Sequence, residues 1–127
     1  MSALRLADSG ILYINPEPAY RHVSAFFPNV VQLSEREYLC LYQRGQGMYA
    51  PDCHLARLRS VDAGGTWADE GALHQPASAG RPYSYHGTFV SRLRDGTLVA
   101  CPFRVDRTDA GRPLFSARGG LVDNEPL

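Results

Sequence analysis

The strongest constraint on the fold of this chain is one turn sequence, Ser60-Val61-Asp62-Ala63-Gly64-Gly65-Thr66-Trp67. An Asp side chain can accept hydrogen bonds from backbone N–H groups inside a turn, and glycines supply backbone angles that other residues rarely adopt. The Trp67 ring can then pack over the loop. The stretch therefore predicts the turn of a β-hairpin, in which Asp62 is a turn acceptor and has no part in catalysis.

The rest of the chain reads as short β-strands separated by turns. Nine prolines and twelve glycines interrupt it, and no window of a dozen residues has a convincing helical apolar period. The dipeptide Asp95-Gly96 is typical of a tight hairpin turn, because both residues tolerate positive φ angles. The predicted strands span residues 11–14, 29–33, 38–43, 53–60, 71–74, 88–93 and 97–104.

An internal repeat organises these strands. Leu33 corresponds to Leu93 and Arg44 to Arg104, each pair 60 positions apart in the sequence. Four antiparallel strands in a unit of about 60 residues fit one blade of a β-propeller. The first blade would span about 20–75 with the turn at 60–67, and the second, incomplete blade about 76–127. Because propellers close with about four to eight blades, we expect the 127 residues to form only part of a propeller.

The turn carries a resemblance to a known family. Its pattern S-x-D-x-G-x-T-W resembles the Asp-box of the sialidase (neuraminidase) superfamily, whose members are six-bladed β-propellers. The resemblance assigns the structural positions of this box to Ser60, Asp62, Gly64, Thr66 and Trp67. It implies an all-β fold and a glycoside hydrolase, or a fragment of one, that acts on terminal sugars of glycans. The alternatives are a non-catalytic Asp-box module that binds glycan or protein, and an inactive truncated product.

The resemblance also suggests catalytic residues. Known sialidases bind the substrate carboxylate with three arginines, protonate the leaving group with an Asp and use a Tyr nucleophile paired with a Glu. Arg44 and Asp52 match the positions of an Arg and the acid, in a loop at the end of the blade opposite the turn. The guanidinium of Arg44 can hold a carboxylate with two hydrogen bonds, and Asp52 can act as general acid if its pKa is raised. Their structural alternatives are a solvated surface charge and an Asx turn.

Substrate contacts are expected at the same end of the blades, from Tyr83, Tyr85, His86 and Arg104. Aromatic rings can stack on sugar C–H faces, and a histidine can donate or accept a proton. The alternative is a tyrosine-rich loop between blades that caps the central channel. Three further arginines are expected to face solvent: Arg107, Arg112 and Arg118.

One departure from the family concerns its first carboxylate-binding arginine. The first strand of sialidases usually begins Phe-Arg-Ile-Pro, and this chain has Ala25-Phe26-Phe27-Pro28. Phe26 therefore occupies the position of that arginine, which argues against an ordinary sialidase. The later Arg, Tyr and Glu of the family would lie in blades outside this sequence.

Composition excludes several other classes of function. Thirteen basic residues balance thirteen acidic ones, so no net charge favours nucleic acid or an anionic membrane surface. No apolar stretch approaches the length of a membrane span, and the N-terminus lacks the pattern of a signal peptide. Three cysteines and four histidines show no metal-site or disulfide spacing. We expect no metal and no cofactor, a glycan or small carbohydrate as the partner, and the remaining blades elsewhere; nothing in the sequence indicates a cellular compartment.

Overall fold

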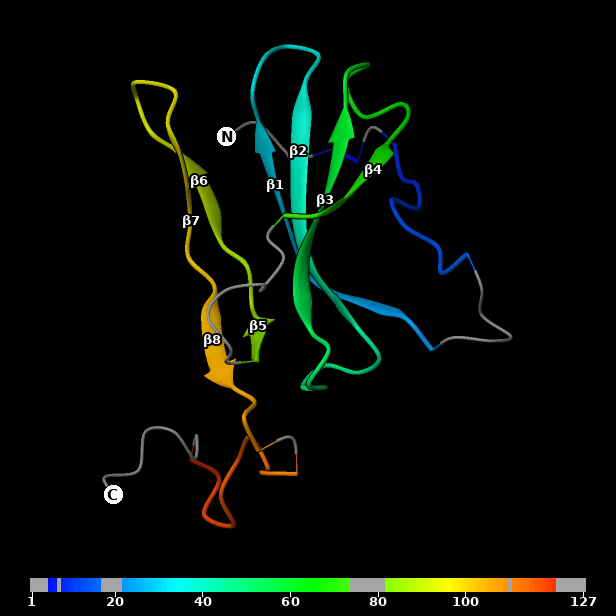
Figure 1. Ribbon diagram of the computed structural model, residues 1–127. Helices are drawn as coiled ribbons and strands as arrows, with labels where there is room; N and C mark the ends of the chain where they lie inside the picture. The colour runs from blue at the N-terminus through cyan, green and yellow to red at the C-terminus, as the bar shows by residue number, and fades with distance from the viewer. Residues whose placement is uncertain (1–4, 7, 17–21, 74–81, 110, 121–127) are drawn as a thin grey trace.

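The computed structural model describes residues 5–6, 8–16, 22–73, 82–109 and 111–120, and in this part of the chain it is all β. Figure 1 shows a four-stranded sheet with a long hairpin beside it. No helix in the described residues is long and apolar enough to cross a membrane. The sheet forms a first unit, residues 22–73, and the hairpin a second unit, residues 82–109.

The first unit is an antiparallel meander in which each strand pairs with the next along the chain. Its central strands are buried on both faces, which explains the unbroken apolar run in the second strand. Leu39 and Leu41 face one side, while Cys40 and Tyr42 face the other. The strands are β1 (Ser24–Gln32), β2 (Tyr38–Gly45), β3 (His54–Ser60) and β4 (Ala68–Ala72).

The second unit is one hairpin whose two arms are each interrupted once. Its strands are β5 (Tyr83–His86), β6 (Val90–Arg92), β7 (Leu98–Ala100) and β8 (Phe103–Asp106), with β6 paired to β7 and β5 to β8. The predicted hairpin turn is confirmed: Leu93 N donates to Thr97 O at 2.8 Å, and Gly96 has φ 88°.

Both units carry the same irregularity at the same place in the repeat. In the first unit, Phe26 pairs with Gln43 but Asn29 with Leu41, so three positions on β1 match two on β2. In the second unit, the eight residues from Tyr83 to Val90 lie opposite the seven residues from Ala100 to Asp106. Each first arm thus contains one extra residue, a β-bulge. A residue with positive φ marks the bulge in each unit, Phe27 (51°) and Gly87 (60°), again 60 positions apart. The spacing of 60 is therefore a repeat of backbone structure.

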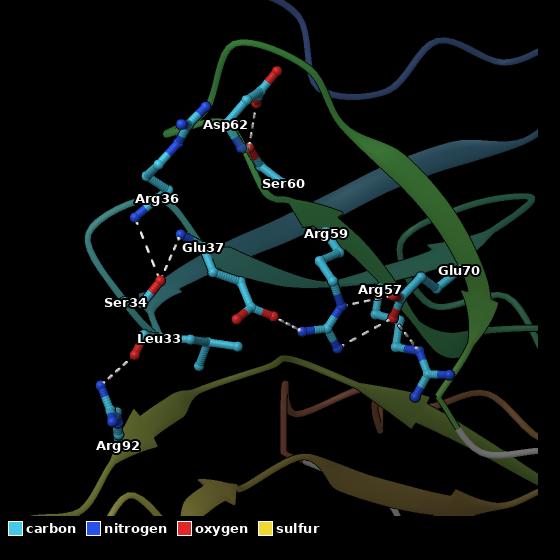
Figure 2. A network of polar contacts seen from close by, with 10 residues as sticks. All are labelled: Leu33, Ser34, Arg36, Glu37, Arg57, Arg59, Ser60, Asp62, Glu70 and Arg92. Carbon is cyan, nitrogen blue, oxygen red and sulfur yellow. Dashed lines mark hydrogen bonds and ion pairs between the residues drawn. The ribbon is translucent and has the colours of Figure 1, made fainter.

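The second unit packs on the Leu39 and Leu41 face of the sheet. Val90 joins these two leucines in one buried cluster, and its backbone N donates to Asn29 Oδ1 at 2.9 Å. Further along the hairpin, Arg92 Nη1 donates to Leu33 O at 2.6 Å (Figure 2). Apolar burial and these directed bonds together fix the position of the hairpin on the sheet.

Ion pairs cross the sheet near the Ser60–Trp67 turn. Figure 2 shows Arg59 between Glu37 on one side, at 2.5 Å, and Glu70 on the other, at 2.6 Å. Arg57 Nε lies 3.0 Å from Glu70, although the contact does not have the angle of a linear hydrogen bond. All four side chains are partly exposed, so solvent screens these pairs and they add little stability.

Several strand predictions were wrong. Residues 11–14 form no strand; Leu12 and Tyr13 instead pack on the buried cluster of Cys40 and Tyr42. The fourth strand begins at residue 68 and ends at 72, earlier than the predicted 71–74. The predicted strand 97–104 breaks at Pro102, which has no N–H for the ladder, and resumes as β8.

Candidate functional site

The Ser60–Trp67 turn closes around the carboxylate of Asp62. Its Oδ1 accepts hydrogen bonds from Thr66 N and Ser60 Oγ, both at 2.8 Å, and its Oδ2 accepts from Thr66 Oγ1 at 2.7 Å. These bonds, the Thr66 backbone bond first, lower the pKa of Asp62 to about 2. The predicted bonding of Asp62 within the turn is confirmed, and its carboxylate is fully used by the turn.

This turn differs from the prediction in one backbone angle and in the burial of Trp67. The positive φ angles fall on Ala63 (63°) and Gly64 (92°), whereas Gly65 was expected to share this role. A side chain at Gly65 would instead crowd the Asp62 carboxylate, because a Cβ there would lie 3.2 Å from Asp62 Oδ2. Trp67 was expected to be largely buried and is only partly so; its Nε1 donates to Gly64 O at 3.1 Å.

The loop that contains Asp52 lies at the opposite end of the sheet from this turn. In the β2–β3 ladder Arg44 pairs with His54, and at the far end Tyr38 pairs with Ser60. His86 is at the Arg44 end too, since its Nδ1 lies 3.2 Å from Met48 O in the 46–53 loop. The prediction that Arg44, Asp52 and His86 share the end opposite the turn is confirmed.

Arg44 is engaged by neighbours in the first unit and in the segment that precedes it. Its guanidinium donates from Nε to Tyr42 Oη at 3.1 Å, forms an ion pair with Asp69 and lies 4.8 Å from the centre of the Tyr13 ring. Burial raises the pKa of the Tyr42 hydroxyl to about 12, although the bond from Arg44 opposes the shift. Arg44 thus stabilises the buried face around Tyr42, and its carboxylate-binding role stays a prediction.

Asp52 closes the 46–53 loop. Gln46 N donates to both carboxylate oxygens, at 3.2 and 3.1 Å, and the side chain is exposed to solvent. The loop is tight at this point, because a Cβ on Gly45 would meet Cys53 Sγ at 2.8 Å. This geometry matches the turn-acceptor alternative, and a general-acid role for Asp52 stays a prediction.

Three of the four predicted substrate contacts lie on one face of the second unit. Tyr83 and Tyr85 lie in β5, paired with the β8 strand that contains Arg104, and not in the loop between blades that the sequence suggested for the two tyrosines. Tyr85 pairs directly with Arg104, whose guanidinium lies 4.6 Å from the centre of the Tyr83 ring. Tyr85 also lines a pocket of about 270 Å³, together with Leu55, Leu73, Ala100 and Pro102. We call this arrangement the Tyr83–Tyr85–Arg104 face.

Side chains alternate between the two faces of β5, so His86 lies on the face opposite Tyr83 and Tyr85. Ser84 and His86 point to the buried side of β5, where both are fully buried. Arg107, which was expected to face solvent, is only 6% exposed and joins them there: its Nε donates to Ser84 Oγ at 2.7 Å. The structure therefore corrects the position of His86 and adds Ser84 and Arg107, which sequence reasoning missed. The alternation of Tyr83-Ser84-Tyr85-His86 was the signal that could have separated the two faces.

Comparison with family models, curated proteins and solved structures finds no match for this chain. Among the described residues no three His, Cys, Asp or Glu side chains gather as a possible metal site. Cys40 and Cys53 are free and buried, while Cys101 is free and exposed. The features that bear on function are therefore the Tyr83–Tyr85–Arg104 face and the Ser60–Trp67 turn.

Proposed function

We propose that this chain is part of a sialidase-like β-propeller hydrolase and that the Tyr83–Tyr85–Arg104 face contacts its sugar substrate. The observation that carries the proposal is the stack of Arg104 on Tyr83, 4.6 Å from the ring centre, beside the pocket that Tyr85 lines. The turn around Asp62 supports the family assignment, since Asp62 accepts bonds from Thr66 inside the turn, as the resemblance to an Asp-box implies.

The chemistry of this face suits a sugar. The Tyr85 ring borders an apolar pocket of about 270 Å³, just below the usual range for small-molecule sites. A ring of this kind can lie against the C–H face of a pyranose while its hydroxyl reaches water. The guanidinium of Arg104 is exposed and lies over the Tyr83 ring, and from this position it can offer two parallel hydrogen bonds to a carboxylate. An acidic terminal sugar supplies both features.

A non-catalytic glycan-binding module is the second candidate, and one observation favours it. Arg44 and Asp52, the two predicted catalytic residues, both have structural partners, in Asp69 and in the backbone of the 46–53 loop respectively. In this reading the Tyr83–Tyr85–Arg104 face binds a glycan and no bond is broken.

Binding of 3′-sialyllactose and of lactose to the full chain, followed by NMR titration, tests the sugar-contacting face. We expect the acidic sugar to bind with a Kd on the order of 1 mM, the weak end of specific binding. Tyr85→Ala should weaken both sugars, and Arg104→Ala only the acidic one. Arg94→Ala, at the exposed hairpin tip, and Tyr38→Ala, at the far end of β2, are the matched controls. Equal affinity in Tyr85→Ala and wild type would contradict the proposal.

Hydrolysis of a fluorogenic sialoside separates the two candidates. We expect no turnover by the 127 residues alone, because the other arginines and the nucleophile belong to further blades. A longer natural form that contains those blades should turn over the sialoside, and Asp52→Asn should abolish the reaction. Sugar binding without turnover in that longer form would favour the binding module. Turnover by the 127 residues alone would show that no further blade is needed and would contradict the partial propeller.

A further inference from the structure

A buried cluster of polar side chains joins the second unit to the 46–53 loop. Ser84 and His86 from β5 are fully buried, and Arg107, just after β8, is 6% exposed. His86 Nε2 lies 2.7 Å from Ser84 Oγ, and His86 Nδ1 lies 3.2 Å from Met48 O. Arg107 completes the link, because its Nη2 donates to Tyr49 O at 3.0 Å. The loop is thus attached to the hairpin by these two carbonyl groups and by Cys53 O, which accepts from Tyr85 N at 2.9 Å.

The hydrogen bonds assign the tautomer of neutral His86. A carbonyl oxygen can only accept, so the Nδ1 atom that faces Met48 must carry the proton. The Nε2 atom then has a free lone pair, which accepts from the Ser84 hydroxyl, while Ser84 Oγ accepts from Arg107 Nε. Every donor in this chain of bonds has an acceptor when His86 is neutral.

A second proton on His86 breaks this pattern. An Nε2–H group would face the Nη2–H of Arg107, whose nitrogen is 3.5 Å away, and would turn the Ser84 hydroxyl aside. Two positive groups would then share a site removed from water, where their repulsion is stronger than at a surface. Protonation of His86 therefore opposes the Arg107 contact that holds Tyr49 O, while the Nδ1–H bond to Met48 O is retained.

No carboxylate among the described residues contacts His86. The Tyr49 ring lies 5.9 Å from the imidazole on the loop side, and the Phe103 ring stacks on it at 5.4 Å. The titratable Cys53 is buried in the same region, where the charges of Arg107 and Asp52 both act on it. Asp52 itself is exposed and accepts from Gln46 N. The charged group in contact with His86 is the cation of Arg107.

We propose that the Ser84–His86–Arg107 cluster is a proton-sensitive lock, which holds the 46–53 loop on the second unit at Tyr49 while His86 is neutral and loosens that attachment when His86 is protonated. The loop carries Met48, Tyr49 and Asp52. This inference does not depend on the proposed sugar site, because none of the three residues of the lock lies on the Tyr83–Tyr85–Arg104 face.

The lock should open in a defined pH range. Burial lowers the pKa of His86 below its ordinary value of 6.5, and the nearby charge of Arg107 lowers it further, against the opposing bond to Met48 O. A depressed pKa means that the folded arrangement binds the proton less well than the released one does. The contribution of the lock is therefore complete above pH 6.5 and is lost as the pH falls through the lowered pKa.

Methyl NMR of the full chain tests the lock, because the sequence has only two methionines, Met1 and Met48. Selective ¹³C labelling of methionine gives one signal from the loop and one from the N-terminus. We expect the Met48 signal to shift reversibly with a midpoint below pH 6.5. Imidazole ¹⁵N spectra of the wild type should show the Nδ1–H tautomer at neutral pH and titration of His86 with the same midpoint.

Three variants separate this lock from other titrations. His86→Asn retains a donor near Met48 O but cannot be protonated, so it should abolish the shift. His54→Gln and Asp52→Asn, which alter the other titratable groups of this end, should leave it in place. A Met48 shift that survives His86→Asn, or one that disappears in Asp52→Asn, would overturn the proposal. If His86→Asn does not fold, the wild type still tests the proposal. An Nε2–H tautomer of His86 at neutral pH would overturn it. Protonation of His86 without any shift of the Met48 signal would also overturn it.

Discussion

Gly87→Ala tests the bulge that the two units share. Gly87 has φ 60°, in the left-handed region where an L side chain costs about 1–2 kcal/mol. Its new Cβ would lie 3.4 Å from Phe103 Cε1, an ordinary contact that adds little strain. Alanine also restricts the unfolded chain, which returns about 0.4–1 kcal/mol of stability. The net expectation is a loss of about 1 kcal/mol in the free energy of unfolding.

Urea unfolding measures this change as a shift of the midpoint at constant slope. Gly47→Ala is the matched control, since Gly47 has no positive φ and a Cβ there would meet nothing within 4 Å. The control should be neutral or up to about 1 kcal/mol more stable than wild type. If Gly87→Ala were as stable as the control, the positive φ at this bulge would carry no cost and the reasoning would be refuted.

Two further substitutions follow from the turn and from the buried cluster. Asp62→Asn should lower the urea midpoint at pH 7 and flatten its pH dependence, because the pKa of Asp62 is lowered from 3.8 to about 2 and its contribution is lost as the pH falls through that range. A wild-type pH profile that persists in Asp62→Asn would contradict this. Arg107→Ala should cost about 1–3 kcal/mol, since it leaves Ser84 Oγ and Tyr49 O without their buried donor. An unchanged urea midpoint would show that Arg107 is not part of the packed structure.

Local signals in the sequence were sufficient for part of the fold. The bonds of Asp62 all fall within residues 60–66, so the sequence of the turn determines them. Strands β2 and β3 were predicted nearly in full, because β2 begins with an unbroken apolar run and β3 alternates buried residues with Arg57 and Arg59. The Asp95-Gly96 turn was predicted for the same local reason, as its residues alone set the backbone angles.

Pairing between distant residues accounts for what was missed. β5 reads as a tyrosine-rich loop by itself and becomes a strand through β8, about 20 positions later. Arg107 was assigned to solvent because arginines are usually exposed, yet the carbonyl of Tyr49 and the hydroxyl of Ser84 enclose it. The apolar residues 11–14 resemble a strand but cover the Tyr42 side of the sheet without pairing.

The sequence predicted which residues form the candidate site better than it predicted how they are arranged. Tyr83, Tyr85 and Arg104 do lie together, because positions 83 and 85 share one face of a strand and Arg104 pairs with the second of them. The same alternation directs His86 to the opposite face, where it meets Arg107. An interpretation of residues 83–86 as a loop could not assign Tyr83 and Tyr85 to one face and His86 to the other.

Mapping of the bound sugar tests the central proposal most directly. The full chain, labelled with ¹⁵N and with ¹³C in its aromatic rings, is titrated with 3′-sialyllactose, and the perturbed signals are assigned. We predict the largest changes at the rings of Tyr83 and Tyr85 and at the side-chain Nε of Arg104, with none at the Ser60–Trp67 turn. Changes centred on that turn, or no change at sugar concentrations of about 10 mM, well above the expected Kd, would contradict the proposed sugar-contacting face.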